Sequence, residues 1–247
     1  MSPNSIQAIP MTNVPVIQSG DDLAKVITQT TMELKDGDIL VIASKVVSIS
    51  ESRIIRGEDI QPSERAIEIA SENGFDPIQV ELAIQESVEL IRTKGVLITE
   101  NKNGLVCNFS GVDKSNAPEG CYILLPENPD ASAERIRDSV TKRTGKQIAV
   151  IISDTQGRPW RKGSVNVAIG TAGIAPFKYN KGKQDLYGRE LKRSTVCQVD
   201  EIAMFVEPLM GQAGQQKPVI IVRGYDYLDS DETSGDVNRL KHEDLFR

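Results

Sequence analysis

Residues 147–163 read QIAVIISDTQGRPWRKG, and this stretch decides the fold because an apolar run and a polar, cationic segment meet in it. The run 148–152 has the length and the β-branched content of a buried strand. We expect this strand to end at 153–155, and a loop rich in glycine and proline to follow it. The loop contains Arg158 and Arg161.

The end of this strand has the chemistry of an ion site. Asp154 and Thr155 provide a carboxylate and a hydroxyl. Mg²⁺ in proteins is usually held by one or two carboxylates together with the phosphate oxygens of a substrate. The segment therefore suits a site for a metal and an anion. The same residues are equally typical of a turn that closes a strand before a solvated basic loop, and both interpretations stand at this point.

The composition is that of an ordinary globular protein. The chain has 247 residues, 39% of them hydrophobic and 26% charged, which is enough for a sizeable core. The formal net charge of -6 argues against a general nucleic-acid binder. No stretch is long and apolar enough to cross a membrane, and the first residues do not resemble a signal peptide. We therefore expect a cytoplasmic protein without a nucleic-acid or membrane partner.

The cysteines and the histidine narrow the possible chemistry. Cys107, Cys121 and Cys197 are few and widely spaced, which favours neither a disulfide framework nor a zinc cluster. His242 is the only histidine and lies in the polar C-terminal segment. Nucleophiles activated by a histidine are therefore excluded. An enzyme built on this chain has to use carboxylates, lysines, arginines and metal ions.

The order of elements predicts an α+β fold with mixed sheets and packed helices. Strands and helices do not alternate as in a doubly wound Rossmann or P-loop fold. The expected strands cover 7–17, 39–43, 96–99, 105–109, 121–125, 148–152, 165–169 and 219–222. The expected helices cover 19 to about 30, 62–74, 77–91, 131–143 with Asp130 as its cap, 184–191, and 195–210 with Phe205 buried. We expect one domain over 1–225, followed by an acid-rich tail over 226–247 that is partly mobile.

Four polar segments follow apolar elements and have related chemistry. The segments are 44–45, 113–116, 154–155 and 211–216, and none matches the Walker P-loop pattern GxxxxGK[ST]. They supply candidate oxygen ligands for a metal, candidate cations for phosphate, and a glycine-rich loop whose backbone N–H groups can approach an anion. The candidate ligands are Asp113, Asp154, Thr155 and Gln212, and the candidate cations are Lys45, Arg158 and Arg161.

Each segment also has a purely structural interpretation. An aspartate after a strand is a common turn former. Gly211 after a helix is typical of a C-cap. Lys45 and the arginines suit a solvated surface, and Trp160 suits core packing or an oligomer contact as well as a platform for stacking a substrate.

Taken together and in order, these stretches resemble the coenzyme F420-0:L-glutamate ligase family, the archaeal type of γ-glutamyl ligase. The pair ISDTQGRPWR and DLYGREL is the most specific part of the resemblance. The other matching stretches, which extend over nearly the whole chain, are VPVIQSGDDLA, DGDILVIASKVVS, PSERA, NFSGVDKSN, VAIGTAG, KQDLYGREL, DEIAMF, LMGQAG and PVIIVRG.

The resemblance implies a function. Members of this family use GTP to join L-glutamate to coenzyme F420-0, a deazaflavin with a phospholactate arm, and then add a second, γ-linked glutamate to F420-1. They form an amide bond while GTP becomes GDP and phosphate. The resemblance also implies Mg²⁺ or Mn²⁺ at two divalent sites, help from K⁺, a distinct α+β fold and a homodimer. Because oxide is a poor leaving group, we further expect the carboxylate to be activated as an acyl phosphate.

The resemblance also implies site residues. The metal ligands correspond to Asp113, Asp154, Thr155 and Gln212, of which the two aspartates are the expected catalytic residues. Apart from the resemblance, the paired N–H donors of Arg158 and Arg161 lead us to expect that these arginines hold phosphate or carboxylate groups of the substrate. The nucleotide contacts correspond to Val14, Pro15, Val16, Ile17, Ser44, Lys45, Asn116, Met210, Gly211, Gln212, Ala213, Gly214, Gln215, Gln216 and Lys217.

The chain departs from the family pattern after its second expected strand. Relatives often have a lysine where Ile49 stands here and a glycine where Ser52 stands. The phosphate contact of that lysine is missing, which bears on the choice between GTP and ATP more than on the reaction. Two other functions are compatible with the same segments. One is a metal-dependent phosphohydrolase or kinase acting on another substrate, and the other is a non-catalytic protein that binds a deazaflavin or a nucleotide.

Overall fold

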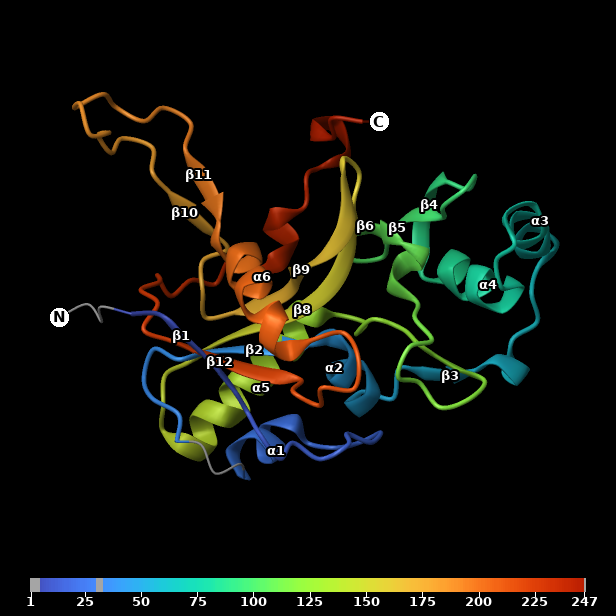
Figure 1. Ribbon diagram of the computed structural model, residues 1–247, viewed down its shortest axis with the longest axis horizontal. Coiled ribbons are helices and arrows are strands. Elements are labelled where there is room, and N and C mark those ends of the chain that lie inside the picture. The colour runs from blue at the N-terminus through green and yellow to red at the C-terminus, as the bar shows by residue number, and fades with distance from the viewer. Residues whose placement is uncertain (1–4, 30–32, 247) are drawn as a thin grey trace.

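A five-stranded mixed sheet forms the centre of the molecule, as the computed structural model of the chain shows for residues 5–29 and 33–246 (Figure 1). The strand order is β1 (Gln7–Pro10), β12 (Val219–Arg223), β2 (Ile39–Ala43), β8 (Ala149–Arg158) and β9 (Arg161–Ala172). Strands β2 and β8 are parallel to each other, and all other neighbouring strands in this sheet are antiparallel. The predicted α+β class with mixed sheets is confirmed.

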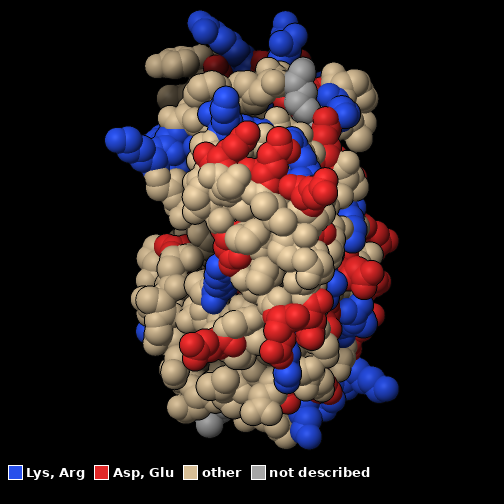
Figure 2. All heavy atoms as spheres, turned by 90° about the vertical axis from the view of Figure 1, so that its right-hand side faces the viewer, with Lys and Arg blue, Asp and Glu red and all other residues tan. Residues whose placement is uncertain are grey.

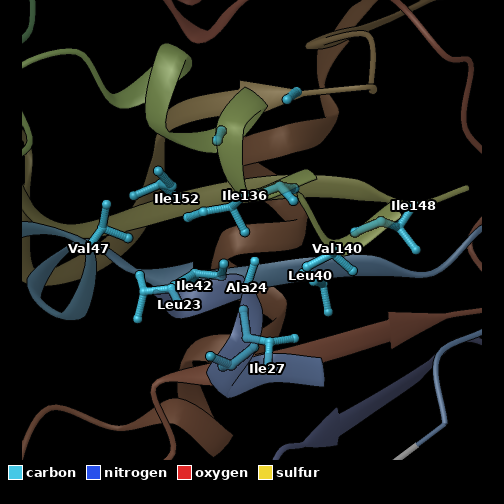
Figure 3. Packing of buried hydrophobic residues seen from close by; sticks show 14 of the residues in the cluster. Leu23, Ala24, Ile27, Leu40, Ile42, Val47, Ile136, Val140, Ile148 and Ile152 are labelled. Carbon is cyan, nitrogen blue, oxygen red and sulfur yellow. The ribbon is translucent and has the colours of Figure 1, made fainter. Parts of the chain in front are cut away.

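Helices cover both faces of this sheet. On one face, Leu40 and Ile42 of β2 pack with Ile136 and Val140, as Figure 3 shows. The helices on this face are α1 (Leu23–Gln29) and α5 (Pro129–Thr144), and α6 (Gln198–Met210) packs on the other face. Because β2 and β8 are buried on both faces, nearly every residue of their central parts is apolar.

Residues 54–123 form a second lobe with its own apolar cluster, which includes Ile69, Val80 and Leu97. Figure 2 shows the side of the molecule that carries this lobe, where acidic and basic side chains are interspersed. The elements of the lobe are β3 (Ile54–Arg56), η1 (Gly57–Asp59), α3 (Glu64–Asn73), α4 (Pro77–Gln85), β4 (Ser87–Arg92), β5 (Ile98–Asn101), β6 (Val106–Asn108), η2 (Phe109–Gly111) and β7 (Cys121–Ile123).

The predicted strand at 148–152 is longer than expected, and the loop expected after it is wrong. Strand β8 continues to Arg158 because β9 pairs with it from Val150 to Arg158, with Thr155 opposite Asn166. Asp154 and Thr155 therefore lie inside a β-hairpin. Only Pro159 and Trp160 remain between the two strands.

Three predicted helices need correction. The helix over 77–91 ends at Gln85, because the following residues pair with β5 as strand β4. The helix over 195–210 begins at Gln198, because 195–197 form β11, and Phe205 on its surface is 49% exposed. The helix over 184–191 is absent. There the Asp185 side chain accepts hydrogen bonds from the backbone N–H groups of Tyr187 and Arg189, and this competes with helix formation.

Smaller differences concern element ends. The predicted strand 7–17 is confined to β1, and the predicted helix 19–30 begins at Leu23, while residue 30 falls outside the described residues. A helix over 44–50, α2 (Ser44–Ser50), was not predicted. The cap of α5 is Asn128, and the Asp130 carboxylate instead accepts from the backbone N–H groups of Thr171 and Ser234.

The last segments complete the fold. A hairpin of β10 (Phe177–Tyr179) and β11 (Thr195–Cys197) carries an arm, residues 180–194, that projects from the body of the molecule (Figure 1). The C-terminal segment contains η3 (Ser234–Val237) and η4 (Lys241–Glu243), and η3 packs against β9. Within the described ranges, no helix combines the length and the apolar character that a membrane crossing requires.

Candidate functional site

A cleft of about 770 Å³ lies between the central sheet and the lobe formed by residues 54–123. All four polar segments singled out in the sequence reach it. Its walls come from 14–17, from α2, from 108–116 and from 210–218, and its floor includes Asp154 and Thr155 of β8. Every predicted nucleotide contact lines this cleft except Gln215. The structure therefore brings together residues that lie far apart in the sequence.

The parallel pairing of β2 and β8 places Ser44 beside Asp154. Ala43 and Ser153 are register partners, so the residues that follow them emerge at the same edge of the sheet. The Ser44 hydroxyl donates to Asp154 Oδ1 at 2.7 Å. Crevices at the carboxyl ends of strands are common ligand sites in sheets with parallel strands.

Lys45 links α2 to the segment at Asp113. Its ammonium donates to Asp113 Oδ2 at 2.8 Å and to the Ser115 hydroxyl at 2.6 Å. Burial alone would raise the pKa of Asp113, but hydrogen bonds from Lys45 and Ser115, together with the charge of Lys45, hold this pKa below its ordinary value. Asp113 is therefore an anion that is already paired with a cation.

Asp154 is in the opposite situation. Burial raises the pKa of Asp154, and the hydrogen bond from Ser44 and the charge of Lys45 offset this effect only in part. The nearby charge of Asp113 raises the pKa further. Two carboxylates thus share the field of one ammonium, and a bound cation would stabilise both of them in the charged form.

Neutral oxygens gather beside Asp154. The Thr155 hydroxyl lies 2.9 Å from Asn166 Oδ1 and 2.8 Å from Gln212 Oε1. Gln212 Nε2 donates to Glu207 Oε1 at 2.9 Å. Within the described part of the chain, no group of three or more His, Cys, Asp or Glu side chains is placed to hold a metal ion. A cation here would be held by two carboxylates, neutral oxygens and oxygens of the ligand, a set that suits Mg²⁺ or Mn²⁺.

Asn166 and Glu207 lie at the candidate site, but the sequence did not predict them as site residues. Asn166 is 2% exposed and lies opposite Thr155 in the β8–β9 ladder. That proximity depends on a strand that continues past Asp154, whereas the sequence favoured a loop there. Glu207 precedes the glycine loop by one helical turn, and only the position of the helix end places it beside Gln212.

The glycine loop, residues 211–216, closes α6, which confirms the C-cap interpretation of Gly211. Gly211 has φ +72° and closes the helix with a hydrogen bond from its N–H to the Glu207 carbonyl. A Cβ at this position would lie 2.4 Å from Cδ of Gln215, whose Oε1 accepts from the backbone N–H of Ala213. Gln215 therefore folds back into the loop, which explains why its neighbours line the cleft and Gln215 does not.

Comparison with known proteins identifies the family. The sequence profile described as F420-0:Gamma-glutamyl ligase matches residues 12–224. The chain belongs to this family. It is 43% identical to the coenzyme F420:L-glutamate ligase of Methanothermobacter thermautotrophicus, over 98% of this chain and 99% of the relative. It is 44% identical to the protein of the same name from Methanocaldococcus jannaschii, over 95% and 94% of the two chains. The resemblance inferred from the sequence is confirmed.

Ile49 and Ser52, where the sequence resemblance suggested a lysine and a glycine, have well-defined surroundings. Ile49 lines the cleft beside Val46, and both side chains pack against the core, so this part of the cleft wall is apolar. Ser52 has φ +61°, a conformation that glycine adopts without strain. Its hydroxyl lies 2.5 Å from that of Ser19, and this contact holds the turn.

Arg158 and Arg161 lie away from the cleft of their own chain. They are paired at the closed end of the β8–β9 hairpin and are not among the residues that line the cleft. The Arg158 guanidinium donates to the backbone carbonyl of Lys162 at 3.1 Å. Trp160, between them, is 77% exposed, and its ring lies 5.4 Å from that of Phe246.

Proposed function

We propose that this protein joins L-glutamate to coenzyme F420-0 at the expense of GTP, and adds a second, γ-linked glutamate to F420-1, in coenzyme F420 biosynthesis. The observation that carries the proposal is the convergence of the four polar segments in one cleft. The family gives this convergence its substrates, since relatives that match nearly the whole chain are named coenzyme F420:L-glutamate ligase.

The reaction has two chemical steps. A carboxylate oxygen of the coenzyme attacks the γ-phosphorus of GTP, which breaks the bond to GDP and gives an acyl phosphate. The amine of glutamate then attacks the acyl carbon, phosphate leaves with the former carboxylate oxygen, and the amine loses a proton. Phosphoryl transfer of this kind depends mostly on positioning and electrostatics, which suits a cleft without histidine.

The side chains of the cleft have distinct proposed tasks. Lys45 and the backbone N–H groups of Gln212 and Gly214 hold the phosphates. Asp113, Asp154, Thr155 and Gln212 hold Mg²⁺ or Mn²⁺ at two sites, with the aspartates as the catalytic residues. When bound, the divalent ions neutralise the charge that develops on the transferred phosphoryl group. K⁺ is proposed as a further activating cation.

The preference for GTP over ATP is a separate part of the proposal. Residues 14–17 and Asn116 line the cleft and are the proposed contacts to the rest of the nucleotide. Because Ile49 provides an apolar wall instead of a lysine, phosphate binding depends more heavily on Lys45. Direct comparison of turnover with the two nucleotides tests this part, and equal rates would remove the guanine preference while leaving the ligase reaction in place.

We propose a homodimer as the working form. Its support is the exposure of large apolar side chains at the ends of two separate hairpins, where Trp160, Leu186 and Tyr187 are 77%, 91% and 83% exposed. Arg158 and Arg161 flank Trp160. Their proposed contact with substrate phosphate or carboxylate groups then requires that the second copy bring its cleft to this hairpin.

One assay tests the function against its rivals. The full chain is incubated with F420-0, glutamate, GTP and Mn²⁺, and the deazaflavin and the nucleotide are both followed by mass spectrometry. We expect products heavier by one and then two glutamyl residues, with one GDP for each. GDP formed without any glutamyl product would instead favour a phosphohydrolase or kinase, and binding without turnover would favour a non-catalytic protein.

A further inference from the structure

The hydroxyl of Thr155 faces more acceptor oxygens than it can satisfy. Asn166 Oδ1 and Gln212 Oε1 lie 2.9 and 2.8 Å from Thr155 Oγ1. A hydroxyl has one hydrogen, so it can donate to only one of them at a time. The three oxygens converge at the floor of the cleft. Such a group of neutral oxygens is favourable when a cation lies among them, because a hard cation is bound by hydroxyl and amide oxygens.

The amide of Asn166 is fixed in the orientation that this arrangement needs. Asn166 is 2% exposed, and its Nδ2 points to Met210 Sδ at 3.9 Å. The oxygen side of the amide is therefore turned toward Thr155 and the cleft. Its weaker contact, 3.4 Å from Gln212 Nε2, leaves this oxygen without a short donor other than the shared hydroxyl.

Glu207 fixes Gln212 in the same way. Its Oε1 accepts from Gln212 Nε2 at 2.9 Å, which turns Gln212 Oε1 toward Thr155. A carboxylate that holds the far side of a ligand orients that ligand and adds negative charge near the metal, as partners behind metal ligands commonly do. Glu207 lies one helical turn before the glycine loop, so it also connects the rigid end of α6 to Gln212.

We propose that Asn166 is a further oxygen ligand of the divalent cation held by Thr155 and Gln212, and that Glu207 is the positioning residue for Gln212. The inference rests on the proposed function in so far as that function needs a divalent cation. It goes beyond it by assigning two residues that neither the resemblance nor the candidate ligand set contains. Asn166 and Glu207 thereby extend the cation site from the cleft floor into β9 and α6.

The test measures Mn²⁺ binding directly. Mn²⁺ is titrated into the full chain, with and without a non-hydrolysable GTP analogue, and free Mn²⁺ is read from its electron paramagnetic resonance signal. The variants are Asn166→Val, Asn166→Asp, Glu207→Ala and Glu207→Gln. Glu201→Gln is the matched control, because Glu201 is an exposed glutamate on the same helix. Thermal melts without Mn²⁺ report any effect on folding alone.

We expect Asn166→Val and Glu207→Ala to weaken Mn²⁺ binding about tenfold or more. Glu207→Gln keeps an acceptor oxygen and is expected to retain most of the affinity, while Asn166→Asp adds charge to the ligand and is expected to bind Mn²⁺ more tightly. If Asn166→Val does not fold, Asn166→Asp decides the assignment of that residue, and affinity equal to that of the native chain would overturn it.

Two negative results have different meanings. Native affinity in Glu207→Ala and in the Asn166 variants, with lower melting temperatures, would show that the network only joins β8, β9 and α6, and would overturn this inference alone. Absence of Mn²⁺ binding by the native chain, even with the nucleotide analogue, would overturn the cation requirement of the proposed function as well as the inference.

Discussion

At the scale of single residues, Asp154 is the side chain whose surroundings oppose its charge most clearly. Burial raises its pKa, and the Ser44 hydroxyl and the more distant charge of Lys45 compensate only in part. Active sites often contain carboxylates in such surroundings, because the substrate or a metal supplies the missing charge. Asp113 has a lowered pKa because Lys45 and Ser115 outweigh the effect of its burial. Asp113 is thus already stabilised as an anion by Lys45, whereas Asp154 needs a further cation to stabilise its charged form.

The substitution Asp154→Asn separates catalysis from stability. Asparagine keeps the size and the acceptor for Ser44, so we expect a folded protein with turnover lower by about 10²-fold or more. Because the pKa of Asp154 is raised in the folded state, the folded protein keeps this proton up to a higher pH than the unfolded chain does. Native stability therefore falls as pH rises from 3.8, the ordinary pKa of the group, through the folded value. The variant lacks this loss and is expected to be at least as stable as the native chain at neutral pH. Thermal melts at several pH values and product analysis check both expectations, and near-native turnover would remove Asp154 from the site.

Asp76 connects two parts of the lobe. It caps α4 through the Ile78 N–H, and its other oxygen accepts from Tyr122 and Lys114, which ties the segment at 113–116 to the start of α4. We expect Asp76→Asn, which keeps the cap, to cost about 1 kcal/mol, and Asp76→Ala about 2 kcal/mol.

The pH dependence of this loss has the opposite sign to that of Asp154. Burial opposes ionisation of Asp76, but the Lys114 and Tyr122 hydrogen bonds hold its pKa below the ordinary 3.8. Its stabilising effect is present above pH 3.8 and is lost as pH falls through the folded pKa. Denaturant titrations at pH 7 and pH 3 measure the difference between native and Asp76→Asn. A difference that grows on acidification would contradict this account.

At the scale of elements, close contact between α5 and β9 fixes one face of the central sheet. A Cβ on Gly170 of β9 would lie 2.4 Å from the backbone carbonyl oxygen of Pro129, at the start of α5. We expect Gly170→Ala to destabilise the fold by about 1–3 kcal/mol, because backbone atoms have to move apart. Gly157→Ala in β8 is the control, since a Cβ there would meet no atom within 4 Å. Equal melting temperatures for the two variants would contradict the packing argument.

The extent of each element shows what the sequence can predict. Strand β2 was predicted with its observed ends, because its apolar run stops where polar residues begin. Strand β8 was predicted too short, because its outer half is polar and is stabilised by pairing with β9. The same limit explains 87–92, where pairing with β5 overrides a helical pattern. Local patterns predict buried elements well, and they predict poorly those segments whose structure depends on a distant partner.

At the scale of the whole molecule, the arm formed by residues 180–194 projects from the body (Figure 1). Leu186 and Tyr187 on this arm are 91% and 83% exposed, which is costly unless another surface covers them. We expect the native chain to sediment as a dimer, and the double variant Leu186→Ser, Tyr187→Ser to weaken association roughly 30-fold or more. Val88→Ser, at a 65% exposed valine of the lobe, is the control. A native chain that sediments as a monomer would contradict the proposed homodimer.

Some residues of the cleft could be predicted from the sequence, and others could not. Ser44, Asp113, Asp154 and Gln212 were expected to meet, because strand ends and helix ends converge at the edges of sheets. Asn166 was not expected, because its place depends on hairpin register. Arg158 and Arg161 were expected near the same ligand, yet the extended hairpin carries them away from the cleft.

The most direct test follows an oxygen atom through the reaction. F420-0 labelled with ¹⁸O in its terminal carboxylate is incubated with the full chain, glutamate, GTP and Mn²⁺, and the released phosphate is analysed by mass spectrometry. If the cleft activates the carboxylate by phosphoryl transfer, the first glutamyl addition is accompanied by one GDP and one phosphate that carries a single ¹⁸O atom. The second addition activates a carboxylate of the unlabelled glutamate, so its phosphate carries no label. Unlabelled phosphate from the first addition, with its new oxygen taken from water, would contradict the account.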